Sequence, residues 1–90
     1  RADTIAAALE SGADEDVERE TETLRREPGR AALVLDELSR HENARVRAWV
    51  PTVAADILGD RGARLILSLT RDRDPGVRDA AVEALHLPLS

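Results

Sequence analysis

The sequence predicts an all-α protein built from three antiparallel helix pairs. Three observations support this fold class. Apolar residues recur at helical spacing, short turn segments separate the apolar stretches, and no stretch alternates apolar and polar residues as a half-buried strand does. The apolar residues are Ala, Val, Leu and Ile with one Trp, while Phe, Tyr, Met and Cys are absent. Such small side chains suit closely packed helices better than a sandwich or barrel.

The C-terminal part of the chain has the clearest pattern. An apolar stretch at 65–69 is followed by an Asp-rich turn, after which a second helix is expected to begin. Asp74 is the predicted N-cap, with Pro75 at the first helical position. The apolar positions that follow have helical period and are Val77, Ala80, Ala81, Ala84 and Leu85.

The same order of features occurs twice more, with anchor valines at positions 17, 46 and 77. In the middle unit Asn43 takes the cap position, and the first unit is the weakest copy. We therefore expect helices near 3–11, 15–26, 29–40, 44–58, 61–71 and 75–87, grouped into repeats of about 3–26, 29–58 and 61–87. Because the connections are short, successive helices should be antiparallel.

The run from Asp72 to Leu85 resembles the signature of the HEAT-repeat family, in the short form of phycocyanobilin-lyase-type and other bacterial HEAT-like proteins. The resemblance implies one domain over 1–90, an α-solenoid of three stacked helix pairs, either complete or part of a longer array. It also implies a ladder of salt bridges between successive repeats. The acids would be Asp72 or Asp74, and the arginines Arg78 and, in the middle unit, Arg47.

The sequence departs from this pattern in the first two units. His41 and Asn43 stand where the middle turn should carry acids, and Glu18 stands where the first unit should carry its arginine. Trp49 is expected to fill the centre of the core, with a stacking platform on a groove as the alternative. Pro51 lies inside the predicted fourth helix, where it removes a backbone hydrogen bond and predicts a bend.

Charge is distributed unevenly along the chain, whose net charge is −5. Residues 1–22 hold eight acids and two arginines. The acidic run at 14–22 begins a helix and lacks the spacing of a calcium loop, so it indicates a solvated face or a patch for a basic partner. A pI near 5.0 argues against nucleic-acid binding. Every basic residue is Arg, which is typical of a GC-rich bacterial genome.

No pattern in the sequence predicts catalysis, a metal or a cofactor. His41 and His86 have no His or Cys three or four residues further on, and no Ser lies in a nucleophile motif. The glycines at 59–62 are too few for a phosphate-binding loop. Without Cys, a signal-peptide pattern or a long apolar stretch, the chain is expected to be cytoplasmic and not to bind membranes.

The predicted function is a non-enzymatic scaffold for a protein or peptide partner, because HEAT-like arrays present the second helix of each pair on a concave binding face. The residues expected on that face are Arg19, Glu22, Arg26, Ala48, Thr52, Ala55, Asp79, Val82, Glu83 and His86. The alternatives are a bilin-lyase-like or other HEAT-type enzyme or chaperone, and a HEAT-type DNA-binding protein. Apolar Leu85, Leu87 and Leu89 predict that a folded-back tail, further repeats or another subunit cover the C-terminal end.

Overall fold

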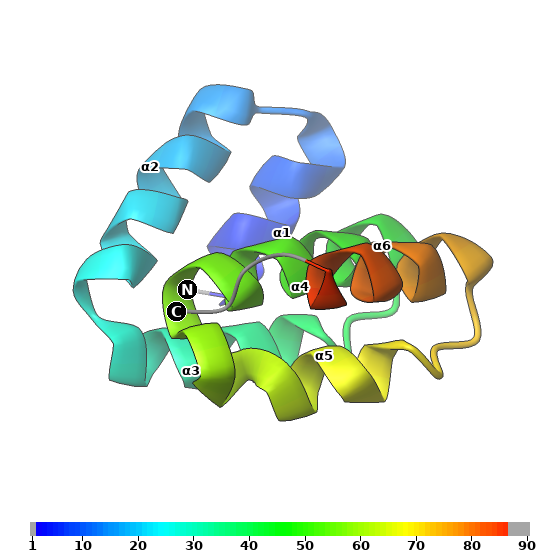
Figure 1. Ribbon diagram of the computed structural model, residues 1–90. Coiled ribbons are helices and arrows are strands. Elements are labelled where there is room, and N and C mark those ends of the chain that lie inside the picture. Colours follow the sequence, from blue (N-terminus) through cyan, green and yellow to red (C-terminus); the bar gives the residue numbers. More distant parts are fainter. Residues whose placement is uncertain (1, 87–90) are drawn as a thin grey trace.

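The computed structural model describes residues 2–86, and this part of the chain is all-α, without strands (Figure 1). In chain order the helices are α1 (Ala2–Ser11), α2 (Asp14–Arg26), α3 (Pro28–Leu38), α4 (Ala44–Leu58), the 3-10 helix η1 (Gly59–Gly62), α5 (Ala63–Leu69) and α6 (Pro75–Leu85). The all-α prediction is confirmed. The single helix expected at 61–71 is instead η1 followed by a short α5. The predicted roles of Leu87 and Leu89 lie outside the described residues.

Side-chain caps define the starts of α4 and α6, as the sequence predicts. The Asn43 Oδ1 atom accepts a hydrogen bond from the Arg45 N–H at 2.8 Å, and the Asp74 Oδ2 atom accepts one from the Val77 N–H at 3.1 Å. Both capping residues have extended backbone, and Pro75 opens α6. Each cap satisfies an amide that has no partner within the first helical turn.

Glycine is required where α1 and α4 end. Gly12 has φ +74° and Gly59 has φ +56°, which is the left-handed region that favours glycine. Gly62 is constrained in a different way, because a Cβ atom at this position would lie 2.9 Å from the Ala54 carbonyl oxygen. This close approach holds η1, and therefore the start of α5, directly against α4.

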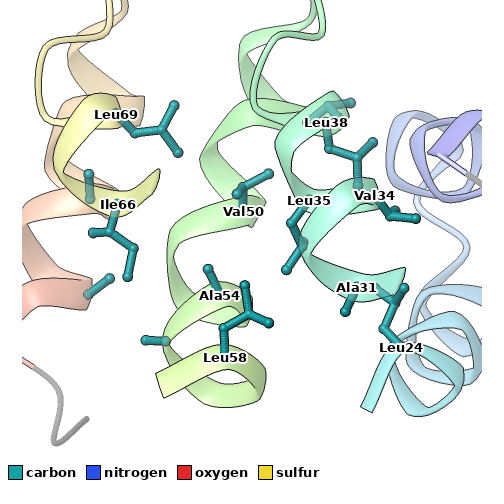
Figure 2. Packing of buried hydrophobic residues seen from close by; sticks show 14 of the residues in the cluster. Leu24, Ala31, Val34, Leu35, Leu38, Val50, Ala54, Leu58, Ile66 and Leu69 are labelled. Carbon is teal, nitrogen blue, oxygen red and sulfur yellow. The ribbon is translucent and has the colours of Figure 1, made fainter. Parts of the chain in front are cut away.

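Helix α4 lies at the centre of the fold and packs against every other helix of the described chain. Figure 2 shows Val50 and Ala54 of α4 between side chains of α3 on one side and of α5 on the other. Leu35 of α3 and Ile66 of α5 are fully buried there. Helices α3 and α5 therefore lie on opposite sides of α4.

Helix α6 packs extensively on α4 through small residues. Val77, Ala81 and Ala84 of α6 are fully buried. Trp49 of α4 is only half-buried and packs at the edge of the core cluster, and Ala80 at the equivalent position of α6 is half-buried as well. The expectation that Trp49 fills the centre of the core is therefore wrong. The face of α4 that is directed into the core contains Val46 and Val50, and Trp49 lies beside this face.

Helix α2 is the least buried of the long helices. Leu24 is its only buried residue, and its other apolar position, Val17, is half-buried. An ion pair between Arg25 Nη1 and Asp56 Oδ2, 2.7 Å apart, connects α2 to α4. The hydrogen bond to Asp56 raises the pKa of Arg25.

At Pro51, which is buried, α4 continues without interruption.

Candidate functional site

A buried ion pair joins helix α4 to the turn before α6. Arg47 Nε donates to Asp72 Oδ2 at 2.9 Å, and Arg47 Nη2 donates to Asp72 Oδ1 at 3.1 Å. The side chains are only 5% and 9% exposed. Arg47 Nη1 also donates to the carbonyl oxygens of His41, at 2.8 Å, and Glu42, at 3.0 Å. The guanidinium is thus held by a bidentate carboxylate and two backbone acceptors.

Hydrogen bonds to Asp72 outweigh the effect of burial on the pKa of its carboxyl. Burial tends to raise the pKa of this carboxyl, but hydrogen bonds from Arg47 and from the Asp74 amide lower it. The Asp74 N–H donates to Asp72 Oδ1 at 2.9 Å. The net effect is a pKa below the ordinary value. The resemblance implied a link between Arg47 and the following unit, and the structure places Arg47 on Asp72.

The turns before α4 and α6 have the same hydrogen-bond pattern although their residues differ. His41 Nδ1 accepts from the Asn43 N–H at 3.0 Å, as Asp72 accepts from Asp74. Arg78 Nη1 donates to the Asp72 carbonyl oxygen at 2.8 Å, as Arg47 does to His41. Within residues 2–86 no carboxylate forms an ion pair with Arg78, so this second arginine lacks the partner that Arg47 has.

Thr52 of α4 and residues at the end of α6 line a hollow of about 530 Å³. The lining residues from α6 are Glu83, Ala84 and, directly after the helix, His86. Thr52, Glu83 and His86 are exposed, and each belongs to the predicted binding face. The His86 Nδ1 atom lies 3.0 Å from the Val82 carbonyl oxygen, which orients the imidazole at the helix end.

The other predicted binding residues of α4 and α6 are placed differently. Ala55 is buried and Ala48 is half-buried. The structure therefore does not present Ala55 on the surface, contrary to the prediction. Asp79 and Val82 are exposed on α6 but do not line the hollow.

The predicted binding residues of α2 are exposed, and none of them lines the hollow between α4 and α6. Arg19 is bound to Asp16 of its own helix at 2.9 Å, and Glu22 lies 3.6 Å from Arg25. Arg26 is exposed at the end of α2. The structure thus does not bring the predicted residues of the three units together at one hollow.

A second hollow, of about 490 Å³, lies between α3 and α5 and is absent from the sequence-based prediction. Leu33 of α3, Arg61 of η1 and Arg64 of α5 are among its lining residues. The feature of the sequence that could have indicated this hollow is Leu33, an apolar residue outside the buried stripe of α3. The distance between α3 and α5 depends on how both pack on α4, which the linear pattern does not specify.

Within residues 2–86 no group of three or more His, Cys, Asp or Glu side chains is placed to hold a metal ion. None of the helices described is both long enough and apolar enough to cross a membrane. Comparison of the chain with protein-family models, curated proteins and solved structures gives no match.

Proposed function

We propose that this chain is a non-enzymatic protein-interaction scaffold that binds a peptide or protein partner on the face formed by α4 and α6. The observation that carries the proposal is the hollow where Thr52, Glu83 and His86 meet. These exposed side chains offer a hydroxyl, a carboxylate and an imidazole. A small number of polar groups that line one hollow is typical of sites that orient a ligand.

We further propose that the helix pairs α1–α2, α3–α4 and α5–α6 are stacked as HEAT-like repeats. The extensive contact between α4 and α6, the second helices of their pairs, supports this arrangement. So does the buried Arg47–Asp72 link, which joins α4 of the second pair to the turn inside the third pair. In such a stack the second helices lie side by side and form one continuous binding face.

The chemistry of the hollow indicates which partner segment it would accept. Glu83 of the lining and Asp79 nearby on α6 are exposed acids, so a basic side chain of the partner is favoured. Val82 is 45% exposed on the same helix and offers an apolar contact. The expected ligand is a peptide segment that combines a small apolar residue with Lys or Arg.

The proposal can be tested by selecting peptides from a displayed library on the immobilised chain. The affinity of a selected peptide is then measured by fluorescence anisotropy for the wild type, Thr52→Arg and Val82→Glu. Thr52→Arg places a bulky cation in the hollow and should weaken binding at least about tenfold. Ala7→Arg, at an exposed position of α1, is the control and should leave the affinity unchanged. Equal binding by all four proteins would show that the α4–α6 face is not the binding face.

A further inference from the structure

The hollow between α3 and α5 has apolar lining residues, some of which remain open to solvent. Leu33 is 70% exposed, although it lies between buried positions of α3. The half-buried Leu65 of α5 and the buried Leu58, at the end of α4, also line the hollow. Leucines from three helices therefore surround one groove.

The groove is a consequence of how α3 and α5 pack. Both helices lie on α4, one on each side of its buried stripe (Figure 2). Gly62 allows the start of α5 to lie directly against α4, because a Cβ atom there would collide with Ala54. Both walls of the groove therefore rest on the same central helix.

The rim of the groove is positively charged. Arg61 and Arg64 are exposed there, and within residues 2–86 neither lies within ion-pair distance of a carboxylate. Asp36 also lines the groove, but its carboxylate is already bound by Arg40. On a chain of net charge −5, this groove is a local site for anionic groups.

We propose that this groove binds an acidic amphipathic helix of a partner protein, at a surface distinct from the α4–α6 face. Apolar side chains at i, i+3 and i+4 of the bound helix would cover Leu33, Leu58 and Leu65. Carboxylates along one edge of that helix would meet the guanidinium groups of Arg61 and Arg64, which bind carboxylates in bidentate geometry. A groove between two helices that lie on a third accommodates a further helix by ordinary ridge-into-groove packing.

The most acidic helix of this chain does not satisfy both requirements in a second copy. This helix is α2, whose exposed residues include Glu15, Glu18 and Glu22. The largest apolar side chain of α2, Leu24, is buried against the core of its own molecule. Helix α2 would therefore bring charge to the groove without covering its leucines.

Three synthetic helical peptides of about four turns test the proposal. The first carries leucines on one face and glutamates along the edges. In the second the leucines are replaced by serines, and in the third the glutamates are replaced by lysines. Anisotropy titrations of the full chain should show binding of the first peptide, with the other two at least about tenfold weaker.

Variants of the chain assign the binding to this groove. The charge reversal Arg61→Glu with Arg64→Glu should weaken the glutamate peptide about tenfold or more and strengthen the lysine peptide. Leu33→Asp should also weaken the glutamate peptide. Arg45→Glu changes the charge at an exposed position of α4 outside the groove and should have no effect. All the substituted residues are exposed, and circular dichroism and urea unfolding verify that each variant keeps the fold.

Two results would overturn the proposal. The first is glutamate-peptide affinity that is the same for the wild type and for the Arg61→Glu, Arg64→Glu variant. The second is a wild-type dimer in sedimentation velocity that the charge reversal dissociates, since the occupant of the groove would then be a second copy. Thr52→Arg, the variant that tests the α4–α6 face, should bind the glutamate peptide normally, so the two surfaces are tested separately.

Discussion

Replacing Asp72 by Ala should be among the most destabilising substitutions in this chain. It removes both carboxylate bonds to Arg47, which is itself only 4% exposed, and leaves a guanidinium charge inside the protein. Breaking a buried pair in this way costs about 3–5 kcal/mol. Because Arg47 retains its bonds to the carbonyls of His41 and Glu42, we expect the lower end, about 3 kcal/mol.

Urea unfolding followed by far-UV circular dichroism measures this effect. The free energy of unfolding for a chain of this size is about 5–13 kcal/mol, so the variant should remain folded in buffer. With an m value of about 1 kcal/mol per molar urea, the unfolding midpoint should fall by about 3 M. The fluorescence of Trp49 offers a second probe of the same transition, and coincidence of the two curves tests two-state behaviour.

Two further variants isolate the buried pair as the cause. Asp36→Ala breaks the exposed pair with Arg40 and should cost less than about 0.5 kcal/mol. Replacing Arg47 and Asp72 together by Leu should cost much less than the sum of the single changes, because no charge is left unpaired. A loss below about 1 kcal/mol for Asp72→Ala, or strictly additive single and double variants, would refute this reasoning.

Three other predictions concern the same fold. Because the pKa of Asp72 is lowered in the folded state, its contribution to stability is complete above the ordinary value of 3.8 and is lost as the pH falls through the lower folded pKa. Urea midpoints measured between about pH 6 and pH 2 should therefore decline as the pH falls below 3.8, and the decline should be smaller for Asp72→Asn. Gly62→Ala should lower the free energy of unfolding by about 1–3 kcal/mol, because its Cβ meets the Ala54 carbonyl oxygen. Gly29→Ala, in open space within α3, should raise it by up to about 1 kcal/mol, and a thermal melt that ranks the two variants in the opposite order would contradict the close contact. Asp74→Ala should lower the free energy of unfolding by about 1 kcal/mol, because the Val77 N–H loses its capping acceptor, and Asp74→Asn should keep most of that stability. Equal melting temperatures for the two variants would exclude a capping role.

Local features of the chain were predictable because their causes are local. The caps at Asn43 and Asp74 depend on a side chain that reaches an amide two or three residues away. The stop at Gly59 depends on backbone conformation at one residue. The Arg47–Asp72 contact extends over 25 residues of sequence, and it was expected only through the resemblance to a repeat family.

Predictions about single side chains on helix surfaces were less accurate. Ala55 was expected on a binding face and is buried, while Trp49 was expected at the centre of the core and lies at its edge. Helical periodicity indicates that one side of α4 is buried. It does not indicate that α6 also packs on this helix, or that the buried surface includes Pro51 and Ala55.

The sequence by itself determined the all-α fold, the approximate positions of most helices and the capping residues of α4 and α6, since these follow from apolar spacing and from contacts within a few residues. Only the tertiary structure decided which surfaces are available to a partner. The hollow at Thr52 and Glu83 and the groove at Leu33 both depend on the way α3, α5 and α6 pack around α4. The reason is physical: a helix packed on one neighbour still has exposed faces, and the position of the next neighbour decides whether such a face is covered or remains open.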